Sequence, residues 1–177
     1  MSKINLEVPY LTQLDNLYEP LGTCNTTSVS MVMKYYGIKG DSSELQLEDQ
    51  LTKKCWAKGW DRHSPTDLVK LFEWKKLKDR FTASASWDDV RKWLTDGNLC
   101  IVHGYFTRSG HIVVIRGFDD AAYNGRGAFI INDPNGEWND WGYEHGQDKG
   151  KAVLYSYSLM QRLCSPDGQL WIHFCSK

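Results

Sequence analysis

Residues 99–118 read LCIVHGYFTRSGHIVVIRGF, two short runs of β-branched and other apolar residues on either side of a polar, glycine-containing segment. Such runs predict strands, here residues 99–105 and 111–118, joined by a turn. Further runs of the same kind follow at residues 128–132, 152–157 and 170–174. The second half of the chain is therefore predicted to form a sheet.

Before residue 99, apolar residues recur at helical spacing, and capping sequences precede several of these segments. The predicted helices begin at Cys24, at Ser42 or Ser43, at Ser64-Pro65 and at Ser86, and three of them end at Gly37, near Leu51 and at Gly97. Residues 55–63 and 135–150 are predicted to be long irregular segments. Helices followed by strands are typical of an α+β domain with a largely antiparallel sheet, and we expect one domain over residues 1–177.

Size and charge exclude several classes of function. The chain has 177 residues with 21 Lys and Arg against 22 Asp and Glu, a net charge of −1. So small a charge gives no field to attract nucleic acid or an anionic membrane, and we expect neither as a partner. The N-terminal sequence lacks the apolar segment of a signal peptide, so we expect synthesis in the cytoplasm. We also expect a monomer. Access to a cell wall would then require a separately encoded pore, a holin.

The five cysteines, an odd number with no CxxC pair, favour neither a disulfide framework nor a zinc site, and we expect no metal or other cofactor. Cys24 differs from the others because it lies where a glycine-containing loop meets a predicted helix. Backbone N–H groups and the helix dipole at that point favour a thiolate, which suits a nucleophile. The alternative is a small buried hydrophobic residue.

His111 and Asp133 lie at ends of predicted strands. His111 begins the run HIVVIRGF, and Asp133 follows the run AFIIN directly before Pro134. If the two strands are neighbours, both side chains lie at one end of the sheet, where a carboxylate can orient an imidazole that acts as general base. Taken singly, His111 also fits a strand cap and Asp133 a turn former.

Together these residues resemble the bacteriocin-processing (double-glycine) peptidase-like family of papain-like cysteine peptidases. The resemblance is carried by VPYLTQ, GTCNTTSVSMVMKYYG, SWDDVRKWLTDGNLCIVHG, GHIVVIRGF and IINDPNG, in this order along most of the chain. It implies a papain-like fold, with Cys24 as nucleophile, His111 as base and Asp133 as orienting residue. It also implies that Gln13 donates a hydrogen bond in the oxyanion hole, beside the backbone N–H of Cys24.

The chain departs from the family pattern after the nucleophile. Asn25, Thr26 and Thr27 replace the small residues common there, which predicts a narrower or more polar neighbouring subsite. The membrane and ATPase domains of the full bacteriocin exporters do not follow the peptidase in this sequence, which argues against processing coupled to export. Asn132 is an alternative third member of the triad, but Pro134 and the family pattern favour Asp133.

Trp138 and Trp141 follow Asp133 in a polar, glycine-rich segment, and we predict that they bind substrate, together with Asn25 and Gly110. Anchoring of the loop is the alternative role for the two rings. The same segment alternates oxygen-bearing side chains as a calcium loop does. A calcium site is only a weak hypothesis, because Trp138 occupies the position where an EF-hand needs glycine.

The combination favours a cysteine peptidase that acts through an acyl-enzyme. A peptidoglycan endopeptidase or amidase of the phage-lysin type is the preferred hypothesis, because exposed aromatic rings suit a wall fragment. A cytoplasmic peptidase, a deconjugating enzyme or a transpeptidase acting on a peptide tail is the second hypothesis. A non-catalytic peptide-binding module is the third.

Overall fold

The computed structural model describes all 177 residues. The helices are α1 (Cys24–Tyr35), α2 (Leu47–Lys58), α3 (Pro65–Trp74), α4 (Trp87–Thr95), the short α5 (Ala122–Gly125) and α6 (Tyr157–Cys164), with a 3-10 turn at Gln13–Asp15. The strands are β1 (Lys3–Asn5), β2 (Lys78–Thr82), β3 (Leu99–Gly104), β4 (His111–Asp119), β5 (Ala128–Asn132), β6 (Glu137–Asn139), β7 (Gly142–Glu144), β8 (Val153–Ser156) and β9 (Ile172–Ser176).

The main sheet is antiparallel and has the strand order β2-β9-β3-β4-β5-β8. Residues 111–115 of β4 pair with β3, and residues 117–119 pair with β1. Gly117 permits this pairing, because a Cβ there would lie 2.0 Å from the carbonyl oxygen of Ile4. The predicted α+β fold with a largely antiparallel sheet is confirmed.

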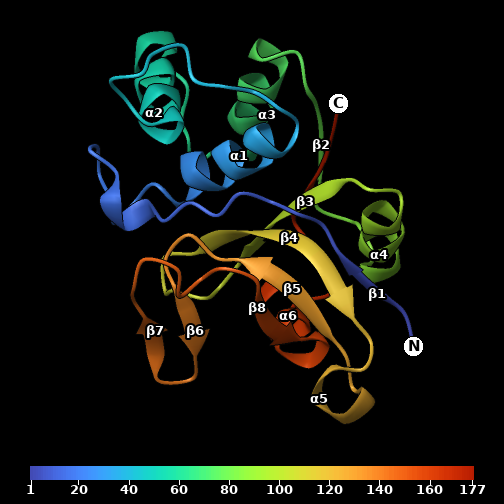
Figure 1. Ribbon diagram of the computed structural model, residues 1–177. Coiled ribbons are helices and arrows are strands. Elements are labelled where there is room, and N and C mark those ends of the chain that lie inside the picture. Colours follow the sequence, from blue (N-terminus) through green and yellow to red (C-terminus); the bar gives the residue numbers. More distant parts are fainter.

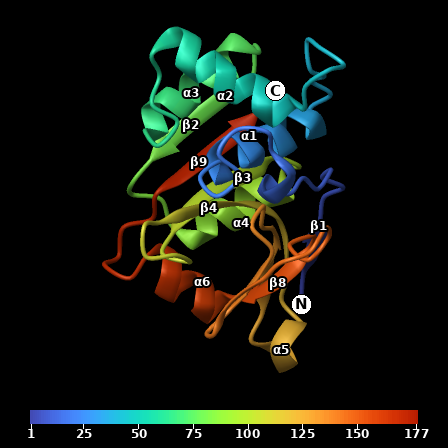
Figure 2. The same ribbon diagram turned by 90° about the vertical axis from the view of Figure 1, so that its left-hand side faces the viewer.

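Two apolar cores cover the two faces of the sheet. Helices α1, α2 and α3 pack on one face through residues such as Val29, Leu51 and Leu71, and Figure 1 shows them together above the sheet. Helices α4 and α6 cover the other face, where Leu94 and Met160 are fully buried, and the rotated view in Figure 2 shows α6 below the strands. None of the helices is both long and apolar enough to span a bilayer.

Several local predictions are confirmed and others are wrong. The helices predicted to start at Cys24, Pro65 and Ser86 and the five predicted strands are present within a few residues. The second helix is displaced: it begins after Gln46 and ends at Gly59, which adopts the left-handed conformation with φ of 65°. Residues 55–58 are therefore helical rather than irregular. The sequence does not predict strands β1 and β2, which are short and partly exposed. Helix α6 is absent from the prediction although Ser156 caps it and Met160, Leu163 and Cys164 form its buried face.

The segment predicted as an irregular loop, residues 135–150, contains the hairpin β6-β7, in which Trp138 pairs with Tyr143. The hairpin projects beside the end of β5 (Figure 1). The N-terminal segment also reaches this region, because the Gln13 N–H donates to the Pro134 carbonyl at 2.8 Å. The end of β5 is thus flanked by the N-terminal segment and by the hairpin.

Candidate active site

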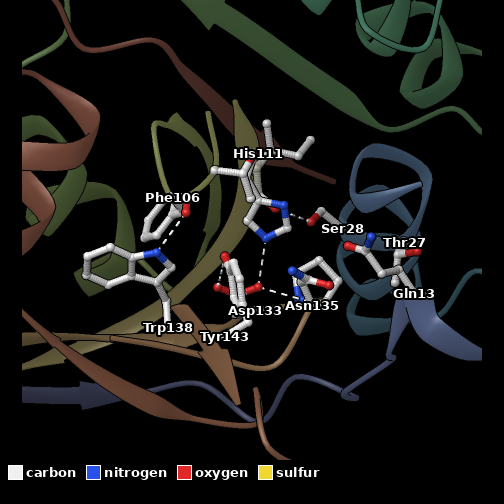
Figure 3. Close-up of polar contacts among 12 residues, drawn as sticks. Gln13, Thr27, Ser28, Phe106, His111, Asp133, Asn135, Trp138 and Tyr143 are labelled. Carbon is white, nitrogen blue, oxygen red and sulfur yellow. Dashed lines mark hydrogen bonds and ion pairs between the residues drawn. The ribbon is translucent and has the colours of Figure 1, made fainter. Parts of the chain in front are cut away.

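His111 and Asp133 meet at the end of the two central strands β4 and β5. His111 is the first residue of β4, Asp133 directly follows β5, and these strands pair antiparallel. The imidazole Nε2 lies 2.7 Å from the carboxylate Oδ1, and both side chains are buried (Figure 3). The contact through Nε2 leaves the Nδ1 of His111 free for another partner.

The Asp133 carboxylate is held by three further donors. Its Oδ2 accepts from the hydroxyls of Tyr143 and Tyr155 at 3.0 Å each, and its Oδ1 accepts from the Asn135 N–H at 3.0 Å. Burial, reinforced by the charge of Asp133, raises the pKa of both tyrosines, so their hydroxyls stay protonated. Each of the two carboxylate oxygens therefore has two hydrogen-bond partners, as a buried charged group requires.

The backbone of Asp133 is fixed as firmly as its side chain. Its N–H donates to the Gly150 carbonyl at 2.8 Å, and its own carbonyl accepts from the Tyr10 hydroxyl at 2.9 Å. Gly150 passes so close that a Cβ there would lie 1.8 Å from the Asp133 carbonyl oxygen. These contacts leave the carboxylate one position, facing His111.

Cys24 is the first residue of α1 and lies beside His111. Burial acts to raise the pKa of its thiol, but the charge and hydrogen bond of His111 and a backbone hydrogen bond from Ile112 outweigh it, so the pKa is lowered. Burial acts to lower the pKa of His111, but Asp133 and Cys24 outweigh it and raise the pKa. The opposite shifts favour a thiolate–imidazolium pair, the reactive form of a cysteine nucleophile.

The family model described as the Peptidase_C39-like family matches residues 5–165. The chain belongs to this family. It is therefore a papain-like cysteine peptidase, and the predicted family and enzyme class are confirmed. Among curated proteins, none matches the chain.

Solved structures with the same fold include three of particular interest. A protein described as a C39-like peptidase from Bacillus anthracis has 16% identity and a TM-score of 0.63, with 100% of this chain and 99% of that chain covered. A double-glycine motif protease from an AMS/PCAT transporter, in complex with the leader peptide, has 19% identity and a TM-score of 0.57, with both chains fully covered. UfSP from C. elegans has 16% identity and a TM-score of 0.59, with 99% of this chain and 34% of that chain covered. At these identities the likeness concerns the fold.

A cleft of about 330 Å³ opens over the thiol and imidazole of this C39-like peptidase. Its lining residues include Cys24, Asn25, Arg62, His63, His103, Tyr105, Gly110, His111, Asp167 and Trp171. Asn25 and Gly110, which we predict to bind substrate, are among the lining residues. The side chain of Asn25 also bonds locally, because its Oδ1 accepts from the Thr26 N–H at 2.9 Å.

The structure separates Trp138 and Trp141 from this cleft, because neither is among its lining residues. The indole N–H of Trp138 donates to the Phe106 carbonyl at 2.7 Å, and the partly buried ring packs against one of the two apolar cores. Trp141, at the tip of the hairpin, is 98% exposed. Trp138 therefore anchors the hairpin, the alternative role considered for it.

Gln13 is buried beside the start of α1, and its Nε2 donates to the Pro20 carbonyl at 2.9 Å. The amide has a second N–H, while its Oε1 is buried without a partner. Arg62, which precedes α3, holds the segment Pro20–Gly22 that leads to the nucleophile. Its guanidinium pairs with Glu19 and donates to the Gly22 carbonyl at 3.4 Å. These contacts fix the loop that leads into Cys24.

Two alternatives from the sequence find other positions. Asn132 bonds Ala152 and the Val8 carbonyl through its side chain, on the side of β5 away from His111. The carboxylates of the suggested calcium loop do not converge, because Asp133 faces His111 while Asp140 pairs with Arg162. No group of three or more His, Cys, Asp or Glu side chains in the chain is arranged to hold a metal ion.

The sequence does not mark the tyrosines that support Asp133. Tyr10, Tyr143 and Tyr155 lie in three distant segments, and none has a neighbour in sequence that marks it as part of a site. The sequence offers only a general signal, the nine tyrosines of the chain. Their role emerges only when the strands and the hairpin are assembled.

Proposed function

We propose that this peptidase hydrolyses a peptide amide bond with Cys24 as nucleophile, His111 as general base and acid, and Asp133 as the orienting carboxylate. The observation that carries the proposal is the connected arrangement at the cleft floor. A thiol with a lowered pKa lies beside an imidazole with a raised pKa, and the imidazole bonds a fully buried carboxylate at 2.7 Å. Nucleophile, base and orienting group in this relation are what acyl transfer requires.

The chemistry proceeds in two stages. The Cys24 thiolate attacks the scissile carbonyl carbon, and the His111 imidazolium gives its Nδ1 proton to the leaving amine as the carbon–nitrogen bond breaks. Water then loses a proton to His111 as its oxygen attacks the thioester, and the carboxylic acid leaves with Cys24 restored as thiolate. Asp133 holds the imidazole and stabilises its charge in both stages.

The developing oxyanion is assigned to the backbone N–H of Cys24 and the second Nε2 hydrogen of Gln13. One oxyanion donor typically contributes about 3 kcal/mol of barrier reduction. Replacing Gln13 with Ala is therefore expected to lower kcat by about 100-fold while Cys24 still reacts with iodoacetamide. Gln13→Glu keeps the volume of the side chain but loses the N–H donor, so it separates loss of the donor from loss of shape, and a similar fall in kcat is expected.

The proposal is tested by labelling and turnover together. Iodoacetamide is expected to modify Cys24 selectively, since burial raises the pKa of Cys55 to about 11 and also raises the pKa values of Cys100, Cys164 and Cys175. Modification is expected to abolish cleavage of a randomised peptide library, and mass spectrometry of the library measures this cleavage. Inhibition without alkylation of Cys24 contradicts the mechanism.

Peptidoglycan peptides are a second candidate substrate. Exposed rings favour it: Tyr105 and Trp171 line the cleft with exposed fractions of 67% and 44%, and Trp141 protrudes from the hairpin. Aromatic faces of this kind can stack on sugar rings. Loss of turbidity of purified cell walls, with identification of the released fragments by mass, tests this candidate against cleavage of free peptides alone.

A further inference from the structure

A second chain of titratable side chains runs from the buried sheet to the wall of the same cleft. Asp79 on β2 lies with its Oδ2 2.7 Å from Nδ1 of His173 on β9, and both side chains are fully buried. His173 Nε2 in turn lies 3.0 Å from Nε2 of His103 on β3. None of the three takes part in the mechanism above.

The sheet register brings these residues together on one face. His173 is opposite Phe81 on β2 and opposite Ile101 on β3. His103 lies two residues beyond Ile101, so its ring stacks on that of His173 with centroids 5.2 Å apart. His103 is also a lining residue of the cleft. The connected side chains therefore extend from a buried carboxylate to the substrate-binding space.

The positions of the protons follow from the partners. The Asp79 carboxylate accepts the Nδ1 hydrogen of His173, and of the two Nε2 atoms that lie 3.0 Å apart in His173 and His103, one must donate and the other accept. Burial and the adjacent His173 lower the pKa of His103 to about 3, so the His103 ring carries one hydrogen. We place this hydrogen on Nε2, toward His173, which leaves Nδ1 of His103 as an acceptor with no partner in the protein.

The neighbouring wall of the cleft adds negative charge and aromatic surface. Asp167 is exposed, forms no salt bridge and accepts only the Gln169 N–H. Trp171 lies beside His103, with ring centroids 6.3 Å apart, and Tyr105 follows two residues after His103. On the opposite wall, the charge of Arg62 is already paired with Glu19. An acceptor nitrogen, a free carboxylate and aromatic faces are the groups that bind a cation.

We propose that His103, Tyr105, Asp167 and Trp171 form a subsite for a basic residue of the peptide substrate, and that buried Asp79 and His173 hold His103 as a hydrogen-bond acceptor. The subsite assignment rests on the proposed peptidase function. His103 contacts the substrate, while Asp79 and His173 are positioning residues that act through it.

Substrate selectivity tests the subsite. A peptide cleaved by the wild-type enzyme is resynthesised with Lys or with uncharged norleucine at each position in turn. At one position Lys is expected to raise kcat/KM at least about tenfold, through a lower KM. Asp167→Asn and His103→Phe are expected to reduce this Lys-to-norleucine ratio toward one. Because the ratio compares two substrates on one enzyme, a lower folded fraction does not change it.

Asp79→Asn tests the positioning role. An amide at residue 79 can donate to His173 Nδ1, which moves the His173 hydrogen to Nε2 and turns His103 Nδ1 into a donor. The Lys-to-norleucine ratio is then expected to fall although residue 79 is fully buried. Asp88→Asn, an exposed carboxylate change on α4 far from the cleft lining, is the matched control that leaves the ratio unchanged. A ratio preserved in Asp167→Asn and His103→Phe overturns the subsite, and a ratio preserved in Asp79→Asn overturns the positioning role of Asp79.

Nuclear magnetic resonance of 15N-labelled Cys24→Ala protein gives a test without turnover. The expected tautomers are Nδ1–H for His173 and Nε2–H for His103. Nα-acetyl-lysine amide, which keeps the charged side-chain ammonium group, is expected at millimolar concentration to shift the His103 signal more than Nα-acetyl-norleucine amide. The opposite His103 tautomer, or equal shifts, refutes the subsite. If these signals behave as expected, but the wild-type protein cleaves no peptide and its Cys24 does not react with iodoacetamide, the proposed peptidase mechanism fails instead.

Discussion

Replacing Asp133 with Asn tests the triad with little change in shape. Oδ1 of Asp133 accepts from both His111 and the Asn135 N–H, so the amide oxygen of the variant is expected to keep this position. The new NH2 group then faces Tyr143 and Tyr155, whose hydroxyls can rotate to accept. The fold and the His111 tautomer are therefore expected to survive, and the main loss is the negative charge.

The size of the effect follows from that loss. A hydrogen bond to a charged group contributes about 1.5–3 kcal/mol, and about 1.4 kcal/mol corresponds to a factor of ten in rate. If the charge-assisted part of the His111 contact is lost in the transition state, kcat/KM falls by about 10- to 150-fold. The pKa of His111 falls too, because Asp133 is one of the groups that raise it.

The assay is alkylation of Cys24 by iodoacetamide as a function of pH, beside peptide cleavage. In the wild type the thiolate–imidazolium pair persists from the lowered pKa of Cys24 up to the raised pKa of His111. In Asp133→Asn the upper limit moves down, so alkylation near neutral pH slows toward that of an ordinary thiol. Tyr143→Phe is the control, because it removes one hydrogen-bond donor to the Asp133 carboxylate but leaves the negative charge of that carboxylate next to His111. Wild-type turnover and an unchanged pH profile in Asp133→Asn would refute the assigned role.

Three other outcomes are expected. Cys24→Ala should abolish cleavage while thermal unfolding changes little, as the side chain lies at a helix end; residual turnover would move the nucleophile elsewhere. Glu48→Gln should stabilise the protein by about 1–2 kcal/mol at pH 8 and by less at pH 4, measured by urea unfolding. Burial raises the pKa of Glu48, whose two oxygens lack partners, so protonated Glu48 is tolerated at low pH and stability is lost as pH rises through its folded-state pKa. Gly150→Ala should lower activity and cost more than about 2 kcal/mol, because its Cβ overlaps the Asp133 carbonyl; Gly146→Ala, which meets only the flexible Lys149 side chain, should be near neutral.

The central strands and the nucleophile helix were predictable because each has a strong local pattern. The runs around Ile101, Val114 and Ile130 are fully or nearly buried and continuous in apolar residues, and such runs identify central strands without any tertiary information. Cys24 could be placed at a helix start from the loop glycine before it and the apolar spacing after it. His111 and Asp133 followed, because strand ends that are neighbours in a sheet bring their side chains together.

The edges of the fold could not be predicted in the same way. Strand β2, KDRFT, has no continuous apolar run and is recognised only by its pairing with β9. The predicted start of helix α2 is too early because Ser42 and Ser43 resemble caps. The helix begins after Gln46, and Gly59 ends it. Local propensity was a weaker determinant there than the packing of Leu51 and Cys55 against α1 and α3.

The hairpin β6-β7 shows why site residues are harder to predict than strands. Its aromatic residues suggested a substrate surface, and sequence alone could not tell which rings would face inward. In the fold the cross-strand pair Trp138 and Tyr143 does two structural tasks: one ring bonds the Phe106 carbonyl and the other bonds the Asp133 carboxylate. Phe106 also contacts the ring of His111 edge-on, with ring centroids 5.9 Å apart. The hairpin therefore supports both the imidazole of His111 and the carboxylate of Asp133. Substitutions that loosen it should therefore lower kcat before they alter KM, whereas substitutions at the cleft wall formed by Asp167 and Trp171 should alter KM first.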